Sequence, residues 1–192
     1  MENKKAHGIN IETDDVLVAL CKAELPYVTT AFEKLVRRYE PMVYRTCLRY
    51  LKSEDEAEEA TQDVFVRLFF NIDRFGGRAS FKTWLFRIVT NICASKYRSL
   101  RRTREQQQAY LEHVELIEQE VQSIDDLELV DGPLINALDT LSAEDREILI
   151  LRHVSDLSFL EISEVLGLKL SASKMRLYRA ERRLRAAMTS RL

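Results

Sequence analysis

The chain has 192 residues, of which 46% are hydrophobic and 31% charged, and its formal net charge is −2. No apolar run approaches the ~20 residues of a membrane span, and residues 1–10 lack the apolar stretch of a signal peptide, so we expect a cytoplasmic protein without membrane insertion. Only five glycines and three prolines occur, which favours helices over turn-rich β structure. The three cysteines are odd in number and far apart in the sequence, so no disulfide framework is expected.

The charges are segregated along the chain. Residues 1–104 carry 19 basic and 14 acidic side chains, residues 105–131 carry nine acidic and no basic ones, and residues 132–192 carry ten basic and eight acidic ones. The basic residues gather in two stretches, 78–104 and 169–192, each within a helical pattern. Two basic stretches separated by an acidic one indicate two nucleic-acid contacts joined by a linker. The alternative is a pair of solvated helix faces.

The first elements in chain order are two amphipathic helices. Apolar residues recur every three or four positions over 14–24 and 29–51, and Pro26 separates the two patterns. Pro41 lies inside the second pattern, where we expect it to kink or restart the helix.

A capping box at Ser53–Glu56 predicts the next helix, over about 54–72. Six carboxylates lie between positions 54 and 63, more than are needed to complement the helix dipole. The excess indicates a surface for a basic partner. Acid–base catalysis is the less favoured interpretation, because nothing in the sequence places these carboxylates in a pocket.

Loop 74–80 contains two glycines but lacks the spacing of a phosphate-binding loop, so nucleotide binding is excluded there. Ser80 then begins a predicted helix that runs to about Arg104. We expect its buried face to comprise Trp84, Leu85, Ile88 and Ile92, although Trp84 is also a candidate base-stacking platform. A polar stripe suited to phosphates and base edges follows another face of the same helix. It comprises Arg87, Asn91, Ser95, Arg98 and Arg102.

The polyanionic segment 105–131 is predicted to be a linker, partly helical or extended, and Gly132-Pro133 follows as a domain boundary. From Leu134 onwards, apolar spacing and capping serines at positions 142 and 158 predict a compact helical domain. Gly167 supplies a tight turn before a basic helix from Ser171 to about Met188. This arrangement is typical of a helix-turn-helix.

The basic helix has two predicted faces. The inner stripe comprises Leu177, Ala180, Leu184 and Met188, and the outward faces carry Lys174, Arg176, Arg179 and Arg183. The three histidines have no Cys or carboxylate partners at metal-ligand spacing, and no nucleophile–base arrangement is visible. We therefore expect no metal, no cofactor and no enzymatic activity.

The chain resembles the bacterial extracytoplasmic-function (ECF) sigma factors of RNA polymerase over about residues 14–188. The resemblance is carried in the first half by AFEKLVRRYEPMVYRTCLRYL, EDEAEEATQDVFVRLFFNIDRF and SFKTWLFRIVTNICASKYR, and in the second by LSAEDREILILRHVSDLSFLEISEVLGL followed by KMRLYRAERRL. It implies an all-α fold of two helical domains joined by an acidic linker. The implied boundaries are 1–104 for sigma domain two, 105–131 for the linker, and 132–192 for sigma domain four with its helix-turn-helix.

The resemblance also implies partners and site residues. The partners are core RNA polymerase, through its clamp and flap regions, and promoter DNA; an anti-sigma factor is a further candidate. The implied activity is promoter recognition, DNA melting and transcription initiation. The core-polymerase-binding residues are Glu56, Glu58, Glu59, Gln62 and Asp63. The residues for the minus-ten element are Phe75, Ser80, Trp84, Arg87, Asn91, Ser95 and Arg98. The residues for the minus-thirty-five element are Ser171, Ser173, Lys174, Met175, Arg176, Arg179 and Arg183.

The start of the recognition helix departs from the family pattern. It reads KLSASKMR from Lys169, where Pro-x-Gly-Thr-Val-Lys/Arg-Ser/Thr-Arg is common, so the resemblance does not imply which DNA sequence is preferred. Ser173 stands where a buried valine is common, and Met175 where a small polar residue is common. The competing hypothesis is a helix-turn-helix regulator with an N-terminal sensing or partner-binding domain. The basic helix over 80–104 and the acidic helix before it favour the sigma factor.

Overall fold

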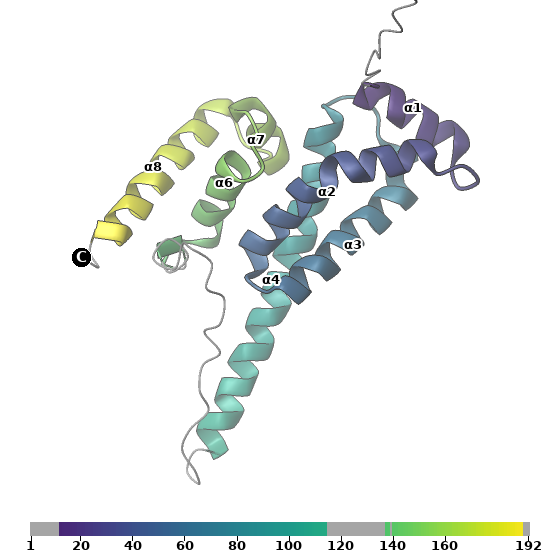
Figure 1. Ribbon diagram of the computed structural model, residues 1–192. Helices are drawn as coiled ribbons and strands as arrows, with labels where there is room; N and C mark the ends of the chain where they lie inside the picture. Colours follow the sequence, from purple (N-terminus) through teal and green to yellow (C-terminus); the bar gives the residue numbers. More distant parts are fainter. Residues whose placement is uncertain (1–11, 115–136, 139, 190–192) are drawn as a thin grey trace, which may run out of the picture.

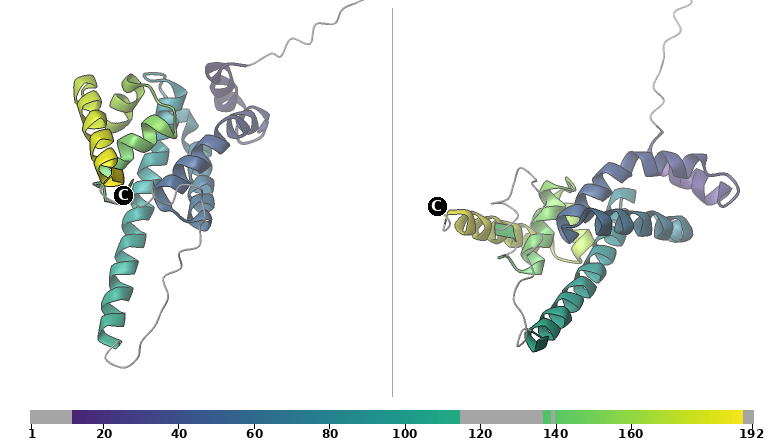
Figure 2. Two further views of the ribbon diagram at one scale, coloured as in Figure 1. Left: turned by 60° about the vertical axis from the view of Figure 1, so that its left-hand side comes forward. Right: turned by 60° about the horizontal axis from the view of Figure 1, so that its bottom comes forward.

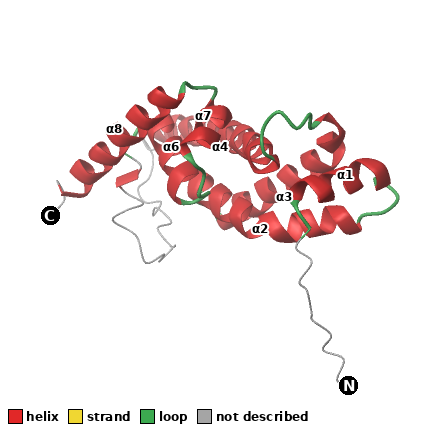
Figure 3. Ribbon diagram, turned by 90° about the horizontal axis from the view of Figure 1, so that it is seen from above, coloured by secondary structure: helices red, strands yellow, loops and turns green. Residues whose placement is uncertain are grey.

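The computed structural model describes residues 12–114, 137–138 and 140–189, and within them the chain forms helices joined by loops (Figure 3). The helices are α1 (Asp14–Glu24), α2 (Thr30–Leu51), α3 (Glu54–Asn71), the 3-10 turn η1 (Ile72–Arg74), α4 (Phe81–Val114), α6 (Ala143–His153), α7 (Phe159–Leu166) and α8 (Leu170–Thr189). The all-α class and its two helical domains are thereby confirmed. The predicted linker lies outside the described residues from position 115 onwards.

The N-terminal domain consists of α1, α2, α3 and the first half of α4 (Figure 1). Its core is lined by the apolar stripes that the sequence spacing predicts. The fully buried side chains include Leu17, Leu35, Val43, Leu68, Leu85 and Phe86. Burying each such side chain contributes about 1.5–3 kcal/mol, which offsets the entropy of ordering the helices.

Helix α4 runs ten residues beyond the predicted end near Arg104 and leaves the body of the molecule (Figures 1 and 2). The predicted helix end was therefore wrong. Residues 105–114 read EQQQAYLEHV, which contains no glycine or proline and is rich in good helix formers, so nothing local stops the helix.

Helix α2 continues through Pro41 rather than restarting there, and it bends along its length in Figure 1. Proline has no N–H to donate to the carbonyl of the preceding turn, which accounts for a bend without a break. The helix ends at Leu51, and the C-cap residue Lys52 adopts a left-handed conformation with φ of 59°.

The predicted serine caps are confirmed. The Ser53 hydroxyl accepts from the Glu56 amide at 3.4 Å, and Ser142 accepts from the Asp145 amide at 3.2 Å. Ser158 forms a complete capping box, because its hydroxyl accepts from the Glu161 amide while the Glu161 carboxylate accepts from the Ser158 amide.

The C-terminal domain, α6 to α8, is a helix-turn-helix with one preceding helix. Gly167 ends α7 in the left-handed region (φ +64°), where a residue without Cβ fits best, and the Leu168 amide then donates to Ser163 O at 2.9 Å. Leu177 and Ala180 are buried and Leu184 is half-buried, as expected. Met188 is 43% exposed near the end of α8, yet it lines the same groove as Leu184, on the side that faces α6.

The two domains pack against each other, with α6 against α2 and α7 against α4, while α1 and α8 lie at opposite ends of the molecule (Figures 1 and 3). The Thr46 and Ser155 hydroxyls meet at 3.0 Å in this interface, and both residues are fully buried. Among the described helices, none is long and apolar enough to cross a membrane.

Candidate polymerase and nucleic-acid interfaces

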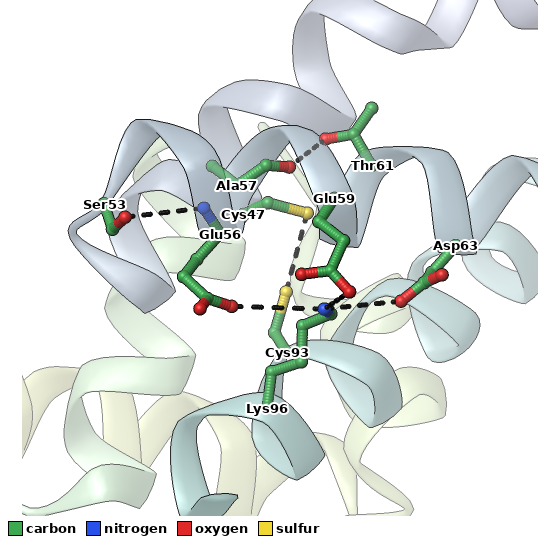
Figure 4. A network of polar contacts seen from close by, with 9 residues as sticks. All are labelled: Cys47, Ser53, Glu56, Ala57, Glu59, Thr61, Asp63, Cys93 and Lys96. Carbon is green, nitrogen blue, oxygen red and sulfur yellow. Dashed lines mark hydrogen bonds and ion pairs between the residues drawn. The ribbon is translucent and has the colours of Figure 1, made fainter. Parts of the chain in front are cut away.

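The acidic residues of α3 gather around one lysine of α4 (Figure 4). The Lys96 Nζ lies 2.8 Å from Glu59 Oε1, 3.5 Å from Asp63 Oδ2 and 4.0 Å from Glu56 Oε2. The Lys96 side chain is only 18% exposed, whereas those of Glu59 and Asp63 are 63% and 52% exposed. The carboxylates therefore remain accessible above a partly buried counter-ion.

The electrostatics of this network keep Lys96 charged. Burial lowers the pKa of Lys96, but the hydrogen bond to Glu59 and the charges of Asp63 and Glu56 outweigh burial and leave the pKa raised above its ordinary value. A single ammonium faces three carboxylates, and Glu58 and Gln62 are exposed on the same helix. This acidic face of α3 consequently retains net negative charge toward solvent. Sequence reasoning missed Lys96 because it is 33 or more positions from its partners.

The acidic face continues into exposed apolar side chains that the sequence interpretation did not single out. Val66 is 56% exposed and Phe70 is 75% exposed, and both lie one or more turns beyond Asp63 along α3. The Phe70 ring packs edge-on against Phe69 with centroids 5.4 Å apart. Positions 59, 63, 66 and 70 share one helical face, so this register was a signal available in the sequence. Acidic and apolar groups side by side are suited to a protein partner.

The polar stripe of α4 is exposed as predicted at Arg87, Asn91, Ser95 and Arg98. Its opposite face is buried at Leu85, Val89 and Ile92, so the stripe is presented by a helix fixed in the core. An exposed amide between guanidinium groups can hydrogen-bond a base edge while the cations hold phosphates.

Two residues predicted for the minus-ten element have structural roles. Phe75 is only 7% exposed, and its ring packs against Trp84 at 5.5 Å and Phe81 at 5.9 Å between centroids, so it cannot stack on a base without leaving the core. The Ser80 hydroxyl accepts from the Thr83 amide at 3.1 Å and caps α4, although the residue is exposed. Trp84 packs over this aromatic cluster and is half-buried, so part of its indole ring remains exposed to solvent.

The C-terminal domain occupies one end of the α4 stripe. The Arg87 guanidinium donates to the Glu164 carbonyl at 2.6 and 3.1 Å, near the C-terminus of α7, where the helix dipole is negative. The Lys82 ammonium donates to the Asp156 carbonyl at 2.9 Å. Arg87 is thus bonded to the C-terminal domain although it remains exposed, whereas no such bond is found for Asn91 and Ser95 among the described residues.

Helix α8 presents a continuous outward face. Ser171, Lys174, Met175 and Arg179 are exposed, and Met175 retains 52% of its surface. Tyr178, at 67% exposed, lies on the same face and was missed because the sequence interpretation considered mainly cations there. Arg176 is half-buried at the edge of this face, and its charge favours ionisation of Glu144 and Glu147 on α6.

Two residues predicted for the minus-thirty-five element have contacts within the C-terminal domain. Ser173 is fully buried and donates to the Lys169 carbonyl at 3.3 Å, because it falls in register with Leu177 and Ala180. Arg183 forms an ion pair with Asp145 of α6, whose side chain is 7% exposed. Both residues therefore hold α8 in place, and the burial of Ser173 keeps its side chain out of reach of DNA.

The part of the chain that the structure describes contains no group of three or more His, Cys, Asp and Glu side chains arranged to hold a metal. His153 lies 3.1 Å from Glu181 on the surface of the C-terminal domain.

The chain matches two family models, Sigma-70 region 2 over residues 35–103 and Sigma-70 region 4 over residues 132–184. It is 30% identical over 134 residues to the ECF RNA polymerase sigma factor EcfG of Rhodopseudomonas palustris, an alignment that covers 70% of this chain and 72% of that protein. The chain belongs to the ECF sigma factors of RNA polymerase. It is also 29% identical over 169 residues to the ECF sigma factor SigW of Bacillus subtilis, covering 81% of this chain and 87% of that one.

Solved structures support the same fold for this sigma factor. CnrH, in complex with the cytosolic domain of CnrY, matches with a TM-score of 0.70 at 24% identity, over 93% of this chain and 99% of that one. The sigma factor RpoE of Bartonella quintana, in complex with the anti-sigma factor NepR, matches with a TM-score of 0.61 at 24% identity, over 84% and 98% of the two chains. The chain is accordingly an alternative sigma factor that directs transcription initiation.

Proposed function

We propose that this sigma factor docks core RNA polymerase with the acidic face of α3, reads the minus-ten element with α4 and reads the minus-thirty-five element with α8. The observation that carries the proposal is the separation of three exposed faces on three rigid helices. One is acidic and apolar, and two are basic or polar. The chain then acts in the cytoplasm beside the polymerase and contributes recognition, leaving catalysis to the polymerase.

Docking through α3 follows from charge and shape. Glu58, Glu59, Gln62 and Asp63 are exposed, and Glu56 is half-buried beneath them. Complementary charge steers association and sets orientation, while exposed apolar groups supply the desolvated contact. We assign Val66 and Phe70 to this second role, so that the polymerase clamp covers the acidic and apolar parts of α3 together.

The melting step is assigned to α4. Asn91 stands in the middle of the exposed stripe, with Ser95 and Arg98 on the following turns. Its amide offers one acceptor and two donors, enough to read the edge of an extruded base, and we assign stacking to the exposed part of the half-buried Trp84 ring, two turns earlier on α4. The guanidinium groups hold the strand backbone, whose contacts carry no sequence information.

Reading of duplex DNA is assigned to α8 through Ser171, Lys174, Met175 and Arg179. A helix in the major groove contacts base edges with the residues near its N-terminus, which are here the exposed positions 171, 174 and 175. An exposed methionine suits an apolar contact, such as a thymine methyl group, and Arg179 suits a phosphate. Met175 would thus make an apolar base contact at the position where a small polar residue is common in the family.

The packing of the two domains has a consequence for promoter binding. Two donor groups of Arg87 are occupied by the Glu164 carbonyl, and α7 packs against α4, the helix that carries the stripe offered to the minus-ten element. We therefore infer that the domains separate when the polymerase binds. The domains are joined by hydrogen bonds such as Thr46–Ser155, Lys82–Asp156 and Arg146–Tyr97 and by buried apolar residues, and contacts to the polymerase and DNA would have to replace both.

The apolar groove between α6 and α8 is assigned to the polymerase flap, the second contact that the family resemblance implies. The groove has a volume of about 630 Å³ and includes Leu149, Val154, Leu184 and Met188 in its lining. An anti-sigma factor is a further proposed partner, since the similar RpoE of Bartonella quintana was solved with one.

Run-off transcription with purified core polymerase on a genomic promoter library tests the proposed function. We expect initiation at a defined set of promoters only when the chain is added. Duplex binding without initiation would instead support a helix-turn-helix regulator with an N-terminal partner domain.

A further inference from the structure

Two cysteine thiols meet in the core of the N-terminal domain, away from the faces assigned to DNA. Cys47 of α2 and Cys93 of α4 are 46 positions apart, yet their Sγ atoms are 3.6 Å apart (Figure 4). Both side chains are fully buried and both thiols are free. The third cysteine, Cys21 of α1, is also buried and lies outside this pair.

We propose that Cys47 and Cys93 form a reversible disulfide when the protein meets a hydroperoxide, so that the core of this domain is a redox modification site. Disulfides in reducing compartments are usually transient and redox-sensing, and this pair places two free thiols close enough for a resolving step. The sequence excluded a disulfide framework on spacing alone, and the fold brings these two residues together.

The chemistry proceeds in two balanced steps. The Cys47 thiol loses its proton, and the thiolate attacks one oxygen of the hydroperoxide. The O–O bond breaks, and the leaving oxygen takes up the proton, so the products are a sulfenic acid on Cys47 and an alcohol, or water in the case of hydrogen peroxide. The Cys93 sulfur then attacks the sulfenic sulfur and loses its proton, and the leaving hydroxide takes that proton to become water. Two thiols are oxidised by two electrons, and the hydroperoxide is reduced by two.

The surroundings of the pair separate the roles of the two sulfurs. The Cys93 thiol donates to Cys47, and this hydrogen bond lowers the pKa of Cys47 against the opposing effect of burial, with the Lys96 charge assisting. The pKa of Cys93 is raised by the same hydrogen bond and by burial. The thiolate is the reactive form of cysteine, so Cys47 is the attacking residue and Cys93 the resolving one.

The geometry allows the bond with little movement. A disulfide brings the sulfurs to about 2.05 Å, so the Sγ atoms must approach by roughly 1.5 Å through side-chain rotation and a small helix shift. The bond would join α2 to α4 and enclose α3 in the loop between them, and long closed loops restrict the unfolded chain most. Because both sulfurs are buried, oxidation waits on local opening of the domain and is expected to be slower than at an exposed thiol.

The test exposes the purified full-length chain to hydrogen peroxide, then denatures it and labels free thiols with a maleimide before mass spectrometry. We expect two of the three thiols to resist labelling, a mass loss of two hydrogen atoms, and one cross-linked peptide pair containing Cys47 and Cys93. The melting temperature should rise by about 10 °C, and dithiothreitol should reverse every change. Cys21→Ala is the matched control and should oxidise as the wild type does, whereas Cys47→Ala and Cys93→Ala should form no internal bond.

Several outcomes would overturn the proposal. The first is a disulfide bond that includes Cys21. The second is a disulfide-linked dimer in place of the internal bond. The third is oxidation of Cys47 to a sulfinic acid while Cys93 stays reduced. Three free thiols after exposure to both hydrogen peroxide and oxidised glutathione would also overturn it, because the second reagent reaches the pair by thiol exchange instead of peroxide attack.

Discussion

Replacing Arg183 by alanine separates the structural and DNA-binding roles of the basic residues on α8. Arg183 pairs with Asp145, whose side chain is 7% exposed, so the substitution leaves a buried carboxylate without its cation. Breaking a fully buried ion pair costs about 3–5 kcal/mol. The Arg183 side chain is 59% exposed, and water screens its half of the pair, so we expect the free energy of unfolding to fall by about 2 kcal/mol.

The matched control is Arg179→Ala, one turn earlier on the same helix and exposed. Thermal unfolding followed by circular dichroism should show a melting temperature about 4–8 °C lower for Arg183→Ala and nearly unchanged for Arg179→Ala. Duplex binding should show the reverse order. Arg179→Ala should weaken cognate and scrambled DNA alike and reduce the slope of log affinity against log salt by about 1.

A double-mutant cycle makes the test quantitative. Asp145→Asn should remove most of the cost of Arg183→Ala, with a coupling energy of about 1 kcal/mol or more. The reasoning would be refuted if Arg183→Ala kept wild-type stability and lost DNA affinity as Arg179→Ala does, since Arg183 would then belong to the DNA-binding face.

Three further predictions concern docking, melting and the domain interface. Changing Glu59 and Asp63 to Lys should weaken core-polymerase binding at least tenfold, and so should changing Val66 and Phe70 to Ser. The control Glu40→Lys on α2 should leave binding unchanged. Equal binding of all variants in a pull-down titration would contradict the assignment of the docking face to α3. Asn91→Ala should keep core binding and duplex binding but slow open-complex formation and relax base preference at one minus-ten position, measured by stopped-flow fluorescence on a promoter panel. Burial raises the pKa of Glu147, which lies near Tyr50 of the other domain. The packing of the domains should therefore be strongest below pH 4.5, where Glu147 is protonated. It should weaken as the pH rises through the raised pKa of Glu147, because the carboxylate is then charged while buried. Glu147→Gln should remove that dependence in urea denaturation followed across pH, and an unchanged pH profile would exclude Glu147 as its source.

Much of this architecture could be predicted from the sequence because helices depend on local signals. Serines at positions 53, 142 and 158 act as caps, and apolar spacing correctly gives the buried face of nearly every helix. The end of α4 could not be placed, because no glycine or proline marks it.

The remaining features depend on contacts between distant parts of the chain. Lys96 beneath the α3 carboxylates, Arg183 on Asp145 and the meeting of Cys47 with Cys93 join residues 33 to 46 positions apart, and no periodicity encodes them. Ser173 is different, since it lies four positions before Leu177 and belongs to the inner stripe by register. The helical period and the family pattern, in which a buried valine is common at this position, both agree with its burial.

Permanganate footprinting of promoter DNA tests the central claim most directly, because it reports strand opening rather than binding. Thymines in the minus-ten region should become reactive when core polymerase and this chain are both present, and remain protected with either one alone. Opening that is strongly reduced in the Asn91→Ala holoenzyme would agree with the assignment of α4 to melting. Protection of those thymines under conditions where the chain and core polymerase are both bound to the promoter would contradict the account.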